Sequence, residues 1–316
     1  MMNTFESVPS VQDLYTPKTI TKLNSDRSLC ERVHALRTRE NALSDLLREK
    51  DISDIHLACR ERIMQMLAET DAEKTAYTDS DPTAFVRSVY DLPRSPFTAR
   101  MRRRARETAR VYKHMCEGSL FVPHDTDGFQ RLWELAMEGE PRWSEDYPSS
   151  AFRTGEVKIY DSLLGQKVLQ VCSAPDRIRP ELTMLLTLMP PDQLLPEIRA
   201  ICGFSMFEWI HPFGDGNGHT GRMFMLSVLS KYYSLPSVVC FSSEFVIRKG
   251  RTARAFATLR TREGTISIDG DLSDFCSSVL SQLEDAQTEA MRLVQKARSC
   301  CFDDTSDSSR TAGGPA

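Results

Sequence analysis

The chain has 316 residues, with 40 Lys and Arg side chains against 44 Asp and Glu and a formal net charge of −4. This balance gives no overall basic field and argues against bulk binding of nucleic acid. Apolar residues make up 41% and charged residues 27%, which is typical of a folded domain. No apolar run approaches the roughly 18–20 residues of a membrane span, and no secretory signal opens the chain. We therefore expect a cytoplasmic protein without a membrane anchor.

The chain is expected to fold between two irregular ends. Its last stretch is rich in Ser, Asp and Gly, and the segment near Pro93 to Pro96 interrupts the helical pattern. We expect a flexible N-terminus, an N-terminal helical segment, a core, a C-terminal helix and a disordered tail, over residues 1–25, 26–96, 97–280, 281–298 and 299–316.

Apolar residues at spacings of three, four and seven predict two amphipathic helices in the N-terminal segment. The first carries Val33, Leu36, Leu43 and Leu47, and the second carries Ile52, Ile55, Cys59, Ile63 and Leu67. A third helix has Met101, Ala105, Tyr112 and Met115 on one face and several arginines between Arg100 and Arg110 on the others. No aromatic platform accompanies these arginines, so we interpret them as a solvated face.

Strand signals occur in one place. Val157–Tyr160 and Lys167–Val171 alternate with a period of two and predict a small hairpin. Helices are then expected over residues 180–189, 194–210 and 220–233. The second of these is apolar on nearly every side from residue 198 onward, so it is expected at the centre of the fold.

The two most apolar helices are joined by residues 211–222, which read His-Pro-Phe-Gly-Asp-Gly-Asn-Gly-His-Thr-Gly-Arg. A polar loop against the core is costly unless its groups find partners, so we expect it to have a function. Its alternating glycines lead directly into a helix N-terminus, a combination that favours anions. Arg222 adds a guanidinium in the first turn. This pattern predicts a polyphosphate site.

Two side chains of this loop indicate chemistry as well as binding. Asp215 is a hard oxygen ligand suited to a Mg²⁺ that bridges phosphates. His211 is of a residue type whose ordinary pKa, about 6.5, suits a general base at neutral pH. Together they predict the activation of a hydroxyl for attack on phosphorus.

Spacing alone leaves other interpretations open. Residues 216–223 come close to the phosphate-binding pattern GxxxxGK[ST], but Arg222 and Met223 replace its last two residues. His211, Asp215 and His219 are four residues apart, as in a zinc site on a helix, although the intervening proline and glycines disfavour a continuous helix. An ordinary glycine-rich loop with hydrogen-bonded histidines is the remaining interpretation.

The string over residues 211–222 resembles the motif of the Fic domain family, HPFx(D/E)GN(G/K)RxxR. The resemblance extends to Phe152-Arg-Thr-Gly-Glu-Val, to the strand near Val168 and to residues 174–178, which are similar to the family's flap hairpin. It implies a mainly α fold, in which a Fic-type helical core over residues 97–280 carries a small β-hairpin flap and an N-terminal helical segment.

The resemblance also implies an activity, namely protein adenylylation, in which AMP moves from Mg²⁺-ATP to a Ser, Thr or Tyr hydroxyl of a target protein. His211 would deprotonate that hydroxyl, and Asp215 would hold the metal ion. The residues implied in nucleotide binding are Gly216, Asn217, Gly218, His219, Gly221 and Arg222. The flap, the Val157 to Val171 region, would hold the target protein by strand addition.

One position departs from the family pattern. His219 stands where the family has its first arginine, and a neutral imidazole offers one donor in place of five. A different phosphate donor, or a binding module with weakened catalysis, is therefore an alternative.

Many Fic proteins also carry an inhibitory helix with the motif (S/T)xxxE(G/N), which Leu36–Asn41 resembles in its last two residues. We hypothesise that Glu40 pairs with Arg222 and blocks the γ-phosphate. Two alternatives are that Glu40 lies at the edge of its apolar stripe and reaches water, and that it positions water for the removal of AMP.

Overall fold

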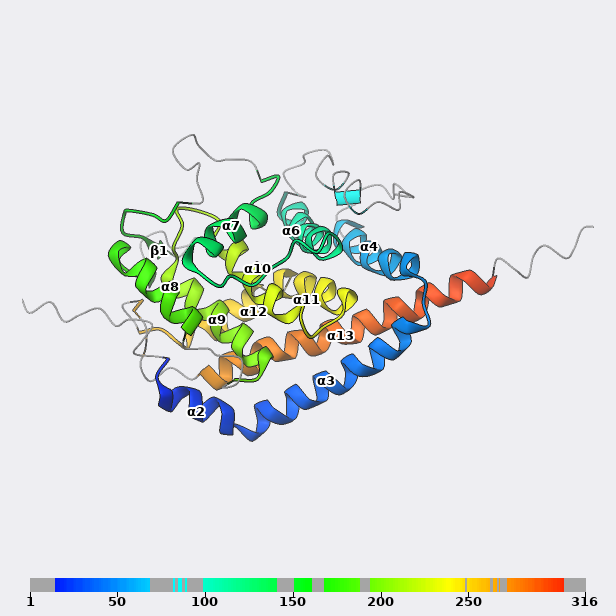
Figure 1. Ribbon diagram of the computed structural model, residues 1–316, viewed down its shortest axis with the longest axis horizontal. Helices are drawn as coiled ribbons and strands as arrows, with labels where there is room; N and C mark the ends of the chain where they lie inside the picture. The colour runs from blue at the N-terminus through cyan, green and yellow to red at the C-terminus, as the bar shows by residue number, and fades with distance from the viewer. Residues whose placement is uncertain are drawn as a thin grey trace, which may run out of the picture.

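The computed structural model describes residues 15–68, 82, 85–86, 89, 99–140, 151–160, 168–187, 194–247, 249–261, 264–265, 267 and 272–303. Over these residues the regular structure consists of helices and one two-stranded hairpin (Figure 1). The mainly α fold expected from the sequence is confirmed. None of the helices in this part of the chain is long and apolar enough to cross a membrane.

The first described helix belongs to the core. Helix α2 (Pro17–Ser25) is capped by Thr16, whose side chain accepts a hydrogen bond from the backbone N–H of Thr19. Ile20 and Leu23 of α2 are buried in the main hydrophobic cluster. The flexible N-terminus expected over residues 1–25 is therefore wrong from residue 15 onward, because these side chains pack against the core.

Two long helices run side by side along one edge of the molecule, α3 (Arg27–Arg48) and α13 (Leu272–Asp303) (Figure 1). Val33, Leu36 and Leu43 are buried on α3 as the stripe predicted. Helix α13 is continuous across residue 280, so the boundary expected there, between a core and a helix over residues 281–298, does not exist. Its last residues, 299–303, had been assigned to the disordered tail.

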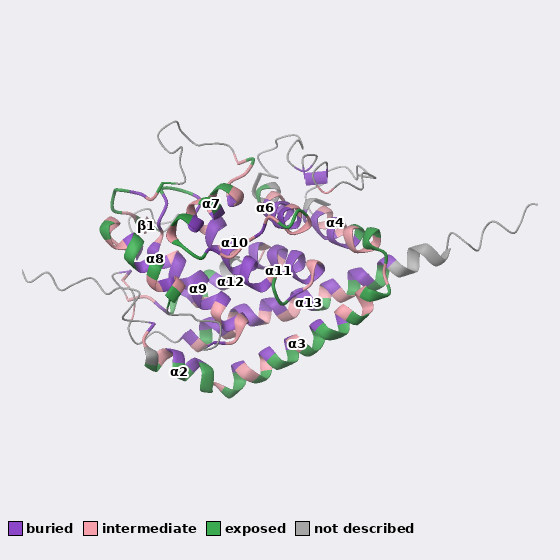
Figure 2. Ribbon diagram, viewed as in Figure 1, coloured by how far each residue is buried: buried purple, intermediate pink, exposed green. Residues whose placement is uncertain are grey.

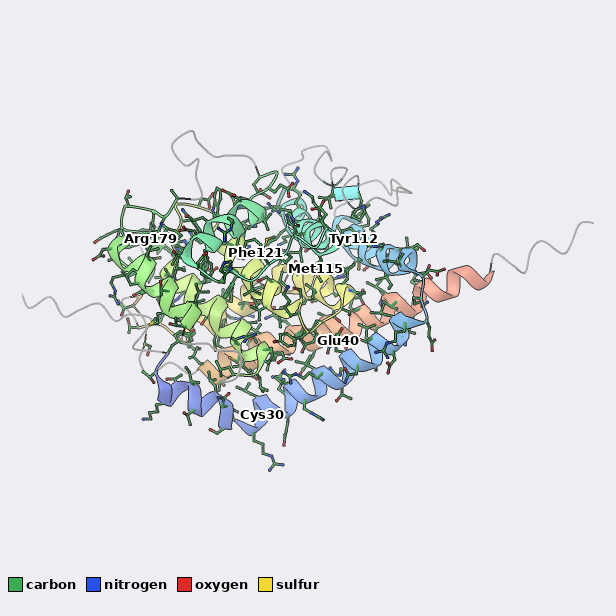
Figure 3. All side chains as sticks on the ribbon, in the orientation of Figure 1. Cys30, Glu40, Tyr112, Met115, Phe121 and Arg179 are labelled. Carbon is green, nitrogen blue, oxygen red and sulfur yellow. The ribbon has the colours of Figure 1, made fainter. Side chains whose placement is uncertain are left out.

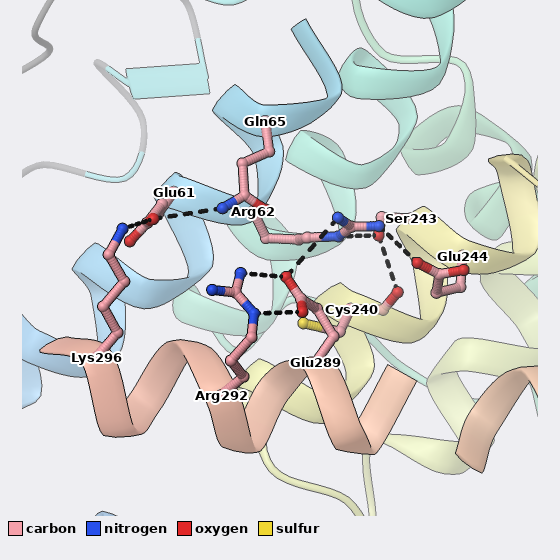
Figure 4. Close-up of polar contacts among 9 residues, drawn as sticks. All are labelled: Glu61, Arg62, Gln65, Cys240, Ser243, Glu244, Glu289, Arg292 and Lys296. Carbon is pink, nitrogen blue, oxygen red and sulfur yellow. Dashed lines mark hydrogen bonds and ion pairs between the residues drawn. The ribbon is translucent and has the colours of Figure 1, made fainter. Parts of the chain in front are cut away.

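Helix α4 (Ile52–Ala68) packs against α6 (Ala99–Cys116), α11 (Leu235–Ile247) and α13. The ε-nitrogen of Arg62 lies 2.6 Å from the Ser243 hydroxyl, and its η-nitrogen lies 2.7 Å from the Glu244 carboxylate (Figure 4). Ile52, expected in the apolar stripe, is 74% exposed. The N-terminal segment is thus packed directly on the core, while the boundary expected between Pro93 and Pro96 lies outside the described residues.

The hairpin lies at the opposite end of the molecule from α4 (Figure 1). Strands β1 (Lys158–Tyr160) and β2 (Val168–Val171) pair antiparallel, with Lys158 opposite Val171 and Ile159 opposite Gln170. Helix α7 (Thr126–Ala136) precedes it, and a 3₁₀ turn (Pro175–Arg177) and α8 (Ile178–Thr187) follow. The predicted hairpin is present.

The centre of the fold is formed by α9 (Pro196–Ile210), α10 (Asn217–Leu229) and α11 (Leu235–Ile247), with α12 (Lys249–Ala257) beside them. Figure 2 shows α9, α10 and α11 as nearly continuous buried ribbon. Helix α10 begins at Asn217, three residues before the expected start at 220. Residues of the glycine-rich string therefore form its first turn and are held between two buried helices.

Candidate active site

The loop between α9 and α10 is fastened to the core by Phe213 and Asn217. Phe213 is fully buried, and its ring lies 5.9 Å from that of Trp133 and 5.5 Å from that of Phe152. The Asn217 side chain accepts a hydrogen bond from the Phe213 N–H at 2.8 Å and donates one to the Phe213 carbonyl at 2.7 Å. The Asn217 side chain thus holds the loop closed.

His211 directly follows α9 and adopts a left-handed backbone conformation, with φ 50° and ψ 59°. Among the described residues it is the one non-glycine residue with positive φ. Burial lowers the pKa of its imidazole to about 4, partly opposed by a polar contact with the Glu208 backbone, while the Arg153 charge lowers it further. The ring is therefore neutral at neutral pH and able to accept a proton.

Gly216 provides the turn into α10. It has φ 80°, and a Cβ there would lie 2.6 Å from the Met137 sulfur and 2.7 Å from the indole nitrogen of Trp133. That indole nitrogen donates to the Asp215 carbonyl at 2.8 Å. Only glycine combines this conformation with this close approach, so α7 and the loop fit together at this residue.

The N-terminus of α10 has no side-chain cap. Thr220 is the first residue of the helix whose N–H has a backbone acceptor, the Gly216 carbonyl at 2.9 Å. The N–H groups of Asn217, Gly218 and His219 thus have no protein acceptor in the part of the chain that is described. Unpaired N–H groups together with the helix dipole form an anion site.

Arg222 is paired with Glu107, a residue of α6. The Arg222 ε-nitrogen contacts one oxygen of Glu107, and its η-nitrogen lies 3.1 Å from the other. Burial alone would raise the pKa of Glu107, but the charges and hydrogen bonds of Arg222 and His219 hold the pKa far below its usual range. Burial opposes the charge of Arg222, yet Glu107 raises the pKa of the guanidinium.

His219 faces the same carboxylate. Its Nδ1 lies 3.2 Å from Glu107, and burial lowers the pKa of the imidazole although Glu107 opposes that shift. His219 and Arg222 therefore share one anionic partner where the sequence pattern predicted phosphate. The helical zinc interpretation fails, since the described residues contain no group of three His, Cys, Asp or Glu side chains that could hold a metal ion.

Glu40 does not contact Arg222. Glu40 lies on α3 (Figure 3). Its carboxylate accepts hydrogen bonds from the Ser234 backbone at 2.7 Å, the Ser237 hydroxyl at 2.6 Å and the Gln287 amide at 3.0 Å. Ser234 immediately precedes α11, so Glu40 caps that helix N-terminus. The hypothesis of a Glu40–Arg222 pair is wrong for this structure, because the carboxylate that meets Arg222 comes from α6.

Glu107 was not among the residues singled out in the sequence. It is the one acidic residue between Ala99 and Lys113, in a helix whose other charges are basic. Such a lone carboxylate is a usable signal. The arginines around it led instead to the interpretation of a solvated helix, and no local pattern shows that Glu107 turns inward.

The flap predicted over Val157 to Val171 continues in the structure on both sides, and from here on the name covers residues 151–160 and 168–173. It lies beside the loop, because the backbone N–H of Arg153 donates to the Pro212 carbonyl at 2.9 Å and Phe152 pairs with Phe213. Strand β2 has β1 on one side, and on the other its Val171 N–H donates to the Gly264 carbonyl at 2.8 Å. In the described residues, β1 pairs with β2 alone and leaves its second edge open.

Comparisons with known proteins find similarity in sequence over part of the chain and similarity in fold. Residues 126–229 match the model of the family described as Fic/DOC. A Fic family protein from Desulfovibrio desulfuricans G20 is 17% identical, with a TM-score of 0.55 over 93% of this chain and 77% of that one. A Fic domain containing signaling protein from Bacteroides thetaiotaomicron VPI-5482 is 15% identical, with a TM-score of 0.49 over 84% and 97%. No curated protein matches. Residues 126–229 are therefore similar in sequence to the Fic/DOC family, and the fold of the chain is similar to that of a Fic family protein.

Proposed function

We propose that the protein transfers AMP from ATP to a Ser, Thr or Tyr hydroxyl of a target protein. The main support is the neutral imidazole of His211, which follows the end of α9 and stands close in sequence to the uncapped N-terminus of α10. A base beside an anion site is suited to the attack of a hydroxyl on a phosphate.

In the proposed reaction, His211 accepts the proton of the target hydroxyl while its oxygen forms a bond to the α-phosphorus of ATP. The bond between that phosphorus and the bridging oxygen breaks, and pyrophosphate leaves with its electron pair. AMP remains on the target, and the proton remains on the imidazole until solvent removes it. The role requires an unprotonated ring, as the lowered pKa of His211 provides.

The phosphates would lie on the first turn of α10, where the N–H groups of Asn217, Gly218 and His219 have no protein acceptor among the described residues. Arg222 would contact the terminal phosphate. Its Nε and Nη2 already donate to Glu107, whereas Nη1 is the nitrogen nearest Gly218, so a phosphate at this turn would share the guanidinium with Glu107. Glu107 thus competes with the phosphate, so the structure supports an autoinhibited enzyme with Glu107 in the role hypothesised for Glu40.

Asp215 fits the proposed Mg²⁺. Its side chain is exposed, and one carboxylate oxygen accepts the Gly216 N–H at 2.7 Å, which leaves the other oxygen available. Mg²⁺ is often held by one or two carboxylates together with substrate phosphates and water, so a lone carboxylate beside a phosphate site is sufficient. When bound, the ion would neutralise charge on the phosphates.

The target protein would add a strand to β1. The inner side of β2 is taken by the Gly264 segment, so β1 offers the free backbone donors and acceptors. Tyr160 on β1 is 50% exposed and provides an aromatic contact at the same edge. We therefore assign target binding to β1 rather than to the whole hairpin.

The test is labelling with α-labelled ATP, and separately with labelled UTP, GTP and CDP-choline, in a Glu107→Gly background. Adenylylation predicts a labelled band with ATP, either the protein itself or a target in a lysate. Label is lost in His211→Ala and kept in His34→Ala, the exposed matched control. If UTP, GTP or CDP-choline labels the protein and ATP does not, that compound is the substrate in place of ATP. If none of the four compounds gives a label, the alternative of a binding module with weakened catalysis is favoured.

A second candidate activity is the removal of AMP. It is favoured by the ionised Glu107 carboxylate, which contacts Arg222 beside the proposed phosphate site. This carboxylate could accept a hydrogen bond from a water molecule and direct that water toward the phosphate. Self-labelled Glu107→Gly protein, freed of ATP, would be mixed with wild-type protein and the release of AMP measured. Release by the wild type, but not by Glu107→Gln, would support removal.

A further inference from the structure

The carbonyl groups at the C-terminal end of α9 are taken up by the flap. The Glu208 carbonyl accepts a hydrogen bond from the Gln170 amide at 2.6 Å, and the Trp209 carbonyl accepts one from the Ser173 N–H at 3.4 Å. A helix leaves its last carbonyls without partners of its own. The flap supplies the donors that α9 lacks, at the helix end from which His211 projects.

Arg153 supplies the donors for the next carbonyls in order. Its Nη2 lies 3.1 Å from the Ile210 oxygen, and its Nε lies 2.7 Å from the His211 oxygen. Its own backbone N–H donates to Pro212 at 2.9 Å. The guanidinium also donates hydrogen bonds to the carbonyls of Gly155 and Ser173. One side chain therefore ties the start of the flap and the end of β2 to the residue proposed as the base.

Pro212 explains why a side chain is needed here. Helices that end in a left-handed residue usually satisfy their last carbonyls with the N–H groups of the residues that follow. Proline has no N–H, so the residue after His211 has no donor to give. The left-handed conformation of His211 is itself unfavourable for a residue with a Cβ, and it persists only where the surroundings hold it.

The hydrogen bonds of the Arg153 guanidinium go to backbone carbonyls. Burial lowers the pKa of Arg153, and the charges of Glu156 and Glu181 partly oppose this shift. The negative end of the α9 dipole and the converging carbonyls also stabilise the charge. Two of the four hydrogen bonds of the guanidinium go to the last turn of α9 and two go to the flap, so the side chain joins these two segments.

We propose that Arg153 is a positioning residue, whose guanidinium holds the left-handed backbone of His211 and so sets the direction of its imidazole. This inference rests on the proposed function, since it concerns the orientation of the base in AMP transfer. Lysine keeps the charge but has no planar fork and fewer donors, and glutamine has neither the charge nor the reach. The two substitutions therefore separate orientation from charge.

The experiment compares Arg153→Lys and Arg153→Gln with the wild type and with Arg48→Gln, an exposed matched control. Histidine-labelled protein gives the NMR signal of the His211 ring, which is assigned by its loss in His211→Ala, and thermal melting checks the fold. Labelling with ATP in the Glu107→Gly background gives kcat and KM.

We expect the NMR chemical shift of the His211 ring to change in both Arg153 variants and to stay unchanged in Arg48→Gln. We expect kcat to fall about 100-fold in Arg153→Lys with KM for ATP within about threefold, since misorientation of a base acts on the transition state. The pKa of His211 should rise in Arg153→Gln, because a nearby positive charge is lost. It should stay unchanged in Arg153→Lys, because lysine keeps the charge.

A folded Arg153→Lys protein with an unmoved His211 signal and an unchanged kcat would overturn the inference. If Arg153→Gln does not fold, the lysine variant decides by the same two measurements. The ring signal also separates the two proposals. A signal that moves in a protein that labels nothing with any donor leaves the positioning role standing and refutes the proposed function.

Discussion

Glu107 of α6 and Arg222 of α10 form a buried ion pair between residues 115 positions apart in the chain. Both side chains are about nine-tenths buried, and His219 contacts the same carboxylate. The pair places a protein anion where the sequence predicted a phosphate. Whatever binds at the start of α10 therefore meets an occupied arginine.

Replacing Glu107 should loosen the free protein and favour the nucleotide. Removing one partner of a buried ion pair costs about 3–5 kcal/mol because the other charge is left alone. We expect Glu107→Gln to lower the melting temperature without ATP and to show a larger upward shift with ATP than the wild type. Glu31→Gln, in an exposed pair with Arg27, is the control. An equal ATP shift in both proteins would contradict the competition.

Replacing Glu40 should affect stability alone. Its carboxylate caps α11 and has no contact with Arg222, so Glu40→Ala leaves the Ser234 N–H and the Ser237 hydroxyl unsatisfied. We expect a loss of about 1–3 kcal/mol in the free energy of unfolding, measured by urea denaturation. Self-labelling should not increase. A rise comparable to that of Glu107→Gly would restore the original hypothesis for Glu40.

The pH dependence should reflect the lowered pKa of His211. The ring is a base only while unprotonated, so kcat/KM should stay level from neutral pH down to about pH 5 and fall around pH 4. With an unshifted histidine, the fall in kcat/KM would have its midpoint at about pH 6.5. Unfolding also lets the ring take up a proton between these two values, so His211 contributes a loss of stability as the pH falls through that window. A midpoint near ~6.5 would show that the base is exposed in the working enzyme.

His219→Arg should strengthen the binding of a triphosphate. A guanidinium carries a permanent charge and five donors, whereas burial keeps His219 neutral at pH 7. The effect is expected in the Glu107→Gly background, where no carboxylate captures the new arginine. There, KM for ATP should fall roughly tenfold with kcat little changed. His219→Gln, which adds no charge, is the matched control and should leave KM unreduced.

Gly216→Ala should be far more harmful than Gly118→Ala. Both glycines have positive φ, 80° and 66°, so the backbone strain of alanine is similar. A Cβ at Gly216 meets Met137 and Trp133, whereas a Cβ at Gly118 has nothing within 4 Å. We expect Gly216→Ala to abolish labelling and Gly118→Ala to lower the melting temperature slightly. Full activity of Gly216→Ala would mean that the loop does not depend on its contact with α7.

The helical pattern and the functional loop were predictable because both are local. Val33, Leu36 and Leu43 repeat at helical spacing and are buried on one face of α3. The glycines, the proline and the ionisable groups of residues 211–222 stand in one continuous string. The predicted start of α10 was three residues too late. Glycine lowers helix propensity, and the two hydrogen bonds between the Asn217 side chain and the Phe213 backbone cannot be seen in the sequence.

The partners of that loop could not be predicted, because they come from distant parts of the chain. Glu40 and Glu107 both lie on helices with apolar stripes, and nothing local distinguishes the carboxylate that reaches Arg222 from the one that caps α11. Arg153 was noticed only as part of the flap, although its side chain ends on the His211 carbonyl.

The amino-acid sequence by itself determined the helices, the hairpin and the chemical groups of the loop, because periodicity and neighbouring residues encode them. The tertiary structure decided which acid faces Arg222, which edge of the hairpin stays open and what holds His211 in place. Those are contacts between segments more than fifty residues apart, and packing of the whole core sets which of the possible partners meet.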